Sequence, residues 1–177
     1  MGKSGHKCGN DAKTTEKRKK DMILQEGTTA GTMDSKGRFQ LPTAILREVP
    51  AACEGRFVIN RGSEKCLRLY RITDWHKLKE KMNKMNTFKA DVRKAVRYFM
   101  GSASEVRLDG KNRLLIPQPL QEYALLEKDL LITTMNTCIE IWNPKLYNEE
   151  MENSSSIECD EFNEMMYDNG EIFNNIS

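Results

Sequence analysis

The chain has 177 residues, of which 38% are hydrophobic, 28 are Lys or Arg and 26 are Asp or Glu. No apolar run approaches the ~18 residues that a membrane span needs, and no apolar core follows the lysine-rich start as in a secretion signal. We therefore expect a soluble, cytoplasmic chain with no membrane partner and with one or two small domains.

The chain begins with a basic leader, 1–24. Residues 1–20 hold seven Lys or Arg against two Asp or Glu, and so polar a segment has too little apolar surface to build a core. We expect it to be disordered, with contact to nucleic-acid phosphates as the alternative role.

An internal repeat occupies the middle of the chain. The segment MDSKGRFQLPTAILRE at 33–48 aligns without a gap with LDGKNRLLIPQPLQEY at 108–123, an offset of 75 residues. Each copy carries the pattern Asp-x-Lys-x-Arg and reaches a proline four residues after the arginine. The matched pairs are Asp34 with Asp109, Lys36 with Lys111, Arg38 with Arg113 and Pro42 with Pro117.

Both copies predict the same order of elements: strand, charged turn, strand, short helix after the proline, and two more strands. Thr43 is a candidate N-cap for the first helix, and Pro119 lies near the start of the second. The last strand is CLRLY in one copy and CIEIW in the other, an alternation typical of a strand with one buried face. We assign 25–72 to the first module and 103–148 to the second.

The segment between the modules, 73–102, predicts a linker of two helices. Apolar residues recur there at spacings of three and four, as in helices that bury one face. We interpret these residues as packing core and not as cofactor contacts. They are Trp75, Leu78, Met82 and Met85 in the first helix, and Val92, Ala95, Val96 and Phe99 in the second.

The chain ends in an acidic tail, 149–177, with nine Asp or Glu and no Lys or Arg. Its composition predicts disorder. Its few aromatic and methionine residues leave open a short docking segment.

Catalytic and metal-binding patterns are missing from the sequence. The five cysteines are scattered without a CxxC pair and there are only two histidines, which fits reduced thiols. The sequence has no glycine-rich phosphate loop, no HExxH and no GxSxG motif. We predict that the chain is not an enzyme and that it binds no metal, cofactor or small-molecule substrate.

The repeated charged turn is the candidate functional site. An arginine fork such as that of Arg38 or Arg113 can bind guanine or phosphate, while lysine acts as a point charge on phosphate. Asp34 and Asp109 are expected to brace the arginines or the turns. The sequence therefore predicts DNA contacts from Lys36, Arg38, Lys111 and Arg113.

Gly37 and Asn112 occupy the same place in the two turns. Glycine adopts a positive φ freely and asparagine is the next best residue for it. Both copies should therefore form one turn type. The alternative is that the two Asp-Arg pairs are plain ion pairs that hold the hairpins together.

The two motifs, DSKGRFQLP and DGKNRLLIP, together with the CLRLY strand and the helices between the copies, resemble the MraZ family. This family belongs to the AbrB-like swapped-hairpin superfamily, so the resemblance implies a mainly β fold with short helices, in which tandem modules exchange hairpins to form a β-barrel. It covers about residues 27–148. The first strand, GTTAGTMD, departs from the family pattern because it lacks an aromatic residue.

The resemblance also implies a function. It implies a transcriptional repressor at the nucleoid that binds short direct repeats of double-stranded DNA upstream of the bacterial division and cell-wall gene cluster. It implies assembly into a homo-oligomeric ring of about eight to twelve subunits. The alternatives are an AbrB-type antitoxin or transition-state regulator, and a structural ring without DNA binding.

Overall fold

The computed structural model describes residues 27–135 and 138–154. The chain divides into two compact units, with the boundary between Asn143 and Pro144. Helix α6, Pro144–Ser154, belongs to the second unit and extends into the segment that we assigned to the acidic tail. The basic leader and the rest of the tail, 155–177, lie outside the described residues.

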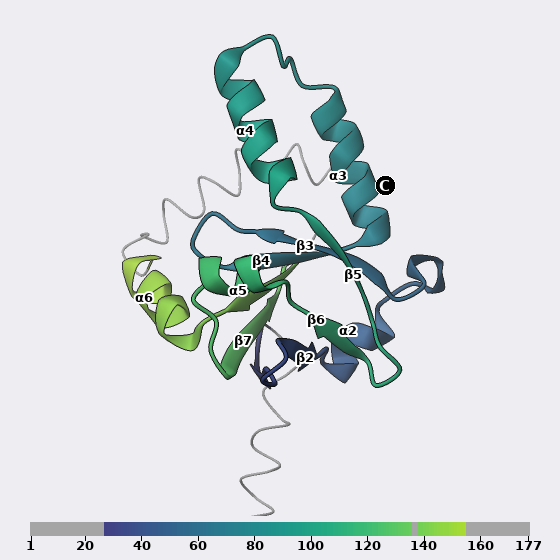
Figure 1. Cartoon of the computed structure of the whole chain (residues 1–177), viewed down its shortest axis with the longest axis vertical. Coiled ribbons are helices and arrows are strands. Elements are labelled where there is room, and N and C mark those ends of the chain that lie inside the picture. The colour runs from purple at the N-terminus through teal and green to yellow at the C-terminus, as the bar shows by residue number, and fades with distance from the viewer. Residues whose placement is uncertain (1–26, 136–137, 155–177) are drawn as a thin grey trace, which may run out of the picture. The chain divides into compact units, whose positions relative to one another are not determined.

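The first unit is mainly β with short helices, and each repeat contributes the predicted series of elements (Figure 1). The repeats therefore have the same secondary structure, as the sequence predicts. The first consists of β1 (Thr28–Thr32), β2 (Arg38–Gln40), α2 (Thr43–Arg47), the 3-10 turn η1 (Ala51–Cys53), β3 (Arg56–Arg61) and β4 (Leu67–Arg71). The second consists of β5 (Ser104–Arg107), β6 (Arg113–Leu115), α5 (Gln118–Tyr123), β7 (Asp129–Thr134) and β8 (Ile139–Trp142).

The strands of the two repeats interleave. A six-stranded antiparallel sheet has the order β1-β7-β8-β4-β3-β5, and β2 pairs with β6 in a separate two-stranded ribbon. Of the six strand pairings, the four between β1 and β7, β2 and β6, β3 and β5, and β4 and β8 join different repeats. Each repeat therefore finds most of its backbone hydrogen-bond partners in the other.

The sheet order reads the same from both ends when the repeats are exchanged, so the repeats are related by a pseudo-two-fold axis. Equivalent residues meet where this axis crosses a strand pair. Phe39 lies opposite Leu114 in the ribbon, and Arg68 lies opposite Glu140 between β4 and β8. The second pair joins opposite charges, with 3.1 Å between Arg68 Nε and Glu140 Oε1.

One hydrophobic core lies between the sheet, the ribbon and the short helices, and both repeats contribute to it. Its members come from inward-facing strand positions and from the helices that follow the prolines. Phe39 and Leu114 close it beneath the ribbon. The buried set includes Leu41, Ile45, Phe57, Ile59, Leu67, Leu69, Ile116, Leu120, Leu130, Ile132, Ile139 and Ile141.

The linker forms two helices, α3 (Ile72–Asn83) and α4 (Ala90–Gly101), as predicted. They lie side by side and extend away from the sheet (Figure 1). Their bases are the best-packed part: Trp75 stacks on Phe99 at 5.6 Å between ring centroids, and Asn60 Nδ2 donates to the Phe99 carbonyl at 3.0 Å.

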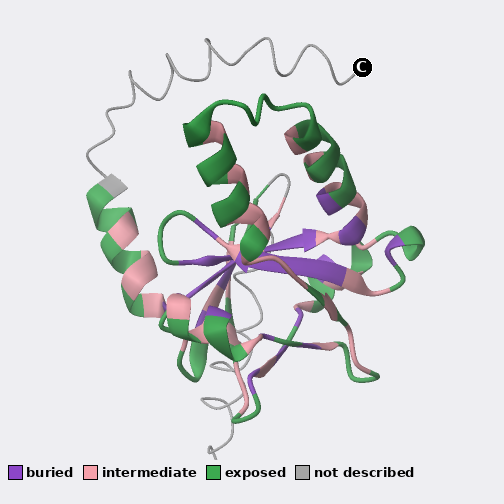
Figure 2. Cartoon of the chain, turned by 45° about the horizontal axis from the view of Figure 1, so that its top comes forward, coloured by how far each residue is buried: buried purple, intermediate pink, exposed green. Residues whose placement is uncertain are grey.

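Three details of the helices differ from expectation. Thr43 makes no capping bond, because it is the first residue of α2 and the N-cap position is occupied by Pro42. Met85 and Ala95, expected in the linker core, are exposed. Much of the outer part of both helices is exposed (Figure 2). It extends away from the sheet, so its apolar residues are at most half-buried, as Met82 and Val92 are.

None of the helices within the described residues has the length and hydrophobicity to cross a bilayer. Three of the five cysteines lie in the described segments, namely Cys53, Cys66 and Cys138, and all three are free thiols. Burial raises the pKa of the Cys66 thiol to about 12, so this side chain stays protonated and behaves as a packing residue at neutral pH.

The ion pair on the axis generates a stability prediction. Glu140 is 8% exposed, so Arg68→Glu places two carboxylates together in a poorly hydrated position. We expect a loss of about 2 kcal/mol in the free energy of unfolding. Combining Arg68→Glu with Glu140→Arg should recover part of it, although the bond that Trp142 Nε1 donates to Glu140 is lost.

Urea denaturation of the full chain measures these differences. Lys77→Glu is the matched control, because the Lys77 side chain is 77% exposed and reversal of its charge should change stability by less than about 1 kcal/mol. If Arg68→Glu and Lys77→Glu lower the free energy of unfolding equally, the ion pair on the axis does not stabilise the fold more than an exposed pair does.

Candidate nucleic-acid interface

Asp34 organises the turn between β1 and β2. Its Oδ1 accepts the backbone N–H groups of Lys36 at 2.9 Å and Arg38 at 3.0 Å. Its Oδ2 accepts Nε of Arg38 at 2.9 Å and contacts Nη2 at 2.8 Å. One carboxylate thus holds the backbone and the guanidinium together.

Asp109 repeats this arrangement in the turn between β5 and β6. Its Oδ1 accepts the N–H groups of Lys111 at 2.8 Å and Arg113 at 3.0 Å. Its Oδ2 accepts Nε of Arg113 at 2.8 Å and lies 2.7 Å from Nη2. The two aspartates brace both their turns and their arginines, as the sequence predicts.

The backbone of both turns requires a left-handed residue at the fourth position. Gly37 has a φ of 78° and Asn112 a φ of 57°, so the prediction from this pair of residues is confirmed. Gly37 also lies under the Gln121 amide, where any Cβ would collide with it. A substitution there would be strained twice, by its φ and by its neighbour.

Each turn is also tied to the opposite repeat. The Gly37 carbonyl accepts the Ile116 N–H at 2.9 Å, and the Asn112 carbonyl accepts the Leu41 N–H at 3.2 Å. In addition, Nη1 of Arg113 lies 4.0 Å from Oδ2 of Asp34. The antiparallel register places the two turns at opposite ends of the ribbon. The ribbon is only three residues long, so the two Asp-Arg pairs still approach each other across it.

The ribbon has one buried and one outward face. Phe39 and Leu114 point inward and are each 1% exposed. Because side chains alternate along a strand, the residues on either side of them share the outer face. The register places Arg38 opposite Leu115 and Gln40 opposite Arg113 on that face.

The arginine side chains are accessible to solvent and are each held in place by an aspartate. The side chain of Arg38 is 31% exposed and that of Arg113 is 26% exposed. Since the aspartates contact Nε and Nη2, the Nη1 end of each fork points away from its own carboxylate. Lys36 and Lys111 are exposed at the tips of the turns.

The ion pairs change the titration of the carboxylates. The side-chain hydrogen bond from Arg38, together with the backbone N–H groups, lowers the pKa of Asp34 from 3.8 to about 2. Arg113 does the same for Asp109, whose pKa falls from 3.8 to about 2. Asp109 in return raises the pKa of Arg113. Both carboxylates remain fully charged at physiological pH.

Sequence reasoning missed Gln40. This residue is exposed and lies on the outer face opposite Arg113 and two residues after Arg38. Its counterpart in the second repeat is Leu115, so the repeat comparison gave no signal for it. Strand alternation beyond Arg38 would have placed it on the same face.

Three potential ligand atoms gather elsewhere in the unit, on Glu64, Cys66 and Glu140. Arg68 already occupies the charge-neutralising position there, at 3.1 Å from Glu140 and 3.5 Å from Glu64. The protonated Cys66 thiol is also a poor metal ligand. This cluster is therefore an ion-pair network that joins β4 to β8.

The fold and the paired turns define a duplicated swapped-hairpin protein that presents two braced arginines on one β-ribbon. The family model described as "MraZ protein, putative antitoxin-like" matches residues 24–98 and again 99–169. The chain belongs to the MraZ family, and it is not an enzyme.

Curated relatives agree with this assignment. The Transcriptional regulator MraZ of Cytophaga hutchinsonii is 39% identical over 71% of this chain and 83% of its own length. That of Christiangramia forsetii is 33% identical over 82% and 94%, and that of Methylococcus capsulatus is 33% identical over 69% and 80%. These relatives identify a family of transcriptional regulators.

The lowered pKa values of Asp34 and Asp109 give a prediction about acid stability. Each folded-state value lies below 3.8, so the bonds stabilise the fold above about pH 4 and are lost as the pH falls toward about 2. The double variant Asp34→Asn/Asp109→Asn should be less stable than wild type at pH 7. That difference should shrink between about pH 4 and pH 2.

Urea midpoints measured across this pH range test the prediction. Asp91→Asn serves as a control, since it removes one exposed carboxylate from the start of α4 without changing a turn. If the difference in urea midpoint between wild type and the double variant stays constant down to pH 2, the charge of the two aspartates does not contribute to stability, and the prediction is wrong.

Proposed function

We propose that this chain is a sequence-specific DNA-binding transcriptional regulator whose β2–β6 ribbon contacts the duplex. The observation that carries the proposal is the placement of Arg38 and Arg113 on one outer face, each braced by an aspartate. The DNA major groove accepts a two-stranded ribbon. An arginine fork held in one orientation can then bind guanine with little further loss of side-chain entropy.

The residues on the outer face have distinct roles in this proposal. Arg38 and Arg113 bind guanine edges or phosphates, and Gln40, which is adjacent to both on the outer face, binds adenine, for which an amide is suited. Lys36 and Lys111 contact phosphates and set the salt dependence of binding. Asp34, Gly37, Asp109 and Asn112 hold the turns in shape and touch no DNA.

The biological role follows from the family. In this proposal the chain is a cytoplasmic, nucleoid-associated repressor of the division and cell-wall gene cluster, and it binds short direct repeats. Modules 25–72 and 103–148, joined by the helices of 73–102, form one DNA-binding unit. A homo-oligomeric ring of about eight to twelve units multiplies weak single contacts by raising the effective concentration of each further one.

A mobility-shift assay with DNA from upstream of that gene cluster tests the site. Arg38→Ala and Arg113→Ala should each weaken binding by at least about tenfold per contacted base, and more in an oligomer. Lys36→Ala should instead lower the slope of log affinity against log salt by about one for each phosphate that the lysine neutralises.

Lys77→Ala is the matched control, because it removes an exposed cation from α3, away from the ribbon. It should bind DNA as wild type does. Circular dichroism and oligomer mass should be unchanged in all four variants. If Arg38→Ala dissolves the oligomer, or binds DNA normally, the arginine is a structural brace and the proposed interface is wrong.

A further inference from the structure

The connection between α3 and α4, residues 84–89, presents two apolar side chains to solvent. Phe88 is 96% exposed and Met85 is 48% exposed. Both helices extend from the sheet toward this tip (Figure 2). Each has 12 residues and is therefore ~18 Å long, at 1.5 Å per residue. The tip is therefore out of reach of the core of its own unit.

The tip is held in shape by hydrogen bonds. Nη1 of Arg93 donates to the carbonyls of Thr87 at 2.9 Å and Phe88 at 3.2 Å. The Phe88 N–H donates to Oδ1 of Asn86 at 3.1 Å. Protein interfaces often contain an aromatic side chain that is exposed in the free protein and becomes buried in the complex. Phe88, on a loop held by hydrogen bonds, is suited to this role.

The charge around the tip is positive. Residues 81–94 hold five Lys or Arg and one Asp. A partner surface should therefore combine an apolar hollow with acidic side chains at its edge.

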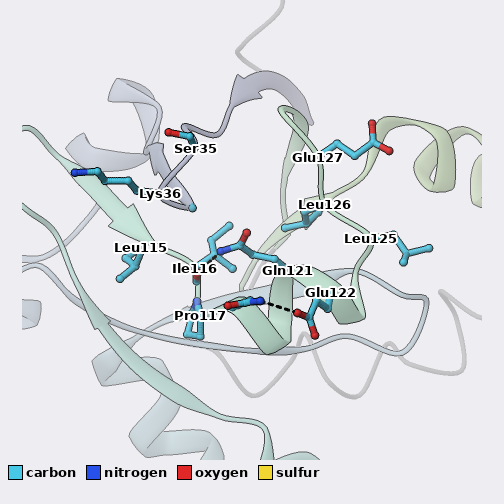
Figure 3. A pocket seen from close by; sticks show the side chains of 12 residues that line it. Ser35, Lys36, Leu115, Ile116, Pro117, Gln121, Glu122, Leu125, Leu126 and Glu127 are labelled. Carbon is cyan, nitrogen blue, oxygen red and sulfur yellow. Dashed lines mark hydrogen bonds between the residues drawn. The ribbon is translucent and has the colours of Figure 1, made fainter.

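The same unit carries an open groove of about 690 Å³ between α5 and the turn of Asp34 (Figure 3). Glu122 and Glu127 lie at its edge, and both are exposed. Apolar side chains form much of its wall. They are Leu115, Ile116, Pro117, Leu125 and Leu126.

Leu125 is unfavourable in the isolated chain. Its φ is 49°, in the left-handed region that follows a helix and that usually holds glycine. Its side chain is also 57% exposed. The backbone of Leu125 is used within the unit, since its carbonyl accepts Asn143 Nδ2 at 2.6 Å. Its exposed side chain adds little to the unit, so a contact outside the unit would account for a leucine at a position that suits glycine.

The pseudo-two-fold axis relates this groove, which both repeats line, to a face at α2 and the turn of Asp109 that has different side chains. The equivalents of Glu122 and Leu115 in the first repeat are Arg47 and Gln40. The matching face is thus basic and polar, and it would repel the tip. Within the described residues, the second repeat thus has an acidic, apolar groove to which the symmetry-related face does not correspond.

We propose that the tip of one copy, with Phe88 at its centre, docks into the groove of a second copy, where Glu122 and Glu127 meet its cations. Because the two surfaces differ, the contact is head-to-tail, and successive copies close into a ring or continue as a filament. This inference deepens the proposed function and rests on its homo-oligomer. In this contact, the cations of the neighbour's tip neutralise Glu122 and Glu127. The groove also contains Lys36, so the contact lies beside one of the proposed DNA-binding residues.

Light scattering of the full chain with single variants is the first test. Phe88→Ser should raise the dissociation constant between copies by about thirtyfold or more, as loss of a central aromatic anchor does. Met135→Ser, which alters another exposed apolar residue, should leave the mass unchanged. The groove variant combines Leu125→Gly with Glu122→Lys. Since glycine suits the backbone at 125, this variant should fold normally and still fail to associate.

Mixing the two variants distinguishes head-to-tail docking from a contact between two tips or between two grooves. Each variant is expected to be a monomer of 20.4 kDa. A Phe88→Ser chain keeps its groove and a groove variant keeps its tip. An equimolar mixture should therefore form a dimer that cannot grow further. Monomers in the mixture would overturn the pairing of these two surfaces.

Two other results would also overturn the inference. If Phe88→Ser assembles like wild type, the tip is not the contact, while the proposed ring and DNA binding remain. If wild type is itself a monomer, both this contact and the ring fail, and mobility shifts then decide DNA binding separately. Phosphatidylserine-containing vesicles are the second probe: if they bind wild type but not Phe88→Ser, and both have equal mass, the partner of the tip is a lipid surface.

Discussion

The fold depends on one constraint, which is that the strands of each repeat find their partners in the other. Buried backbone N–H and C=O groups must be hydrogen-bonded, and β1 and β5 each pair only with a strand of the opposite repeat. The core is shared in the same way, since Phe39 and Leu114 close it together. Neither repeat can therefore satisfy its backbone or bury its apolar face alone. The ribbon that carries Arg38 and Arg113 exists only because the repeats interlock.

The braced turns follow from that arrangement. Each turn is anchored by a backbone bond to the other repeat, through the carbonyls of Gly37 and Asn112. The aspartate then fixes the arginine against this anchored backbone. An exposed ion pair adds little to stability by itself, so its effect lies in the orientation of the guanidinium. A guanidinium that is ordered during folding loses less entropy when it meets a planar partner.

Several features could be predicted from the sequence because they depend on local chemistry. The repeat, the order of elements, the Asp-Arg contacts and the positive φ of Gly37 and Asn112 follow from spacing and residue type, and the structure confirms them. The pairing of strands between repeats came from the family resemblance, because strand alternation carries no information about which strand lies beside which. The contact between Arg68 and Glu140 depends on that register, and so does the position of Gln40. The exposure of Met85 could not be predicted either, since a helical stripe does not reveal where its helix leaves the core.

The departures from symmetry show what a duplicated chain can do that a dimer of identical modules cannot. On the axis of such a dimer, position 68 or 140 would meet its own copy, so two arginines or two glutamates would face each other. With two different repeats in one chain, Arg68 and Glu140 attract, and pairing between unlike repeats is favoured over pairing between like ones. The same freedom lets one groove become acidic while its equivalent stays basic. The turns, by contrast, keep the same Asp-Lys-Arg set in both repeats. The two repeats thus keep the same residues in the turns of the proposed DNA interface. They differ at the Arg68–Glu140 contact and at the groove, where unlike surfaces meet.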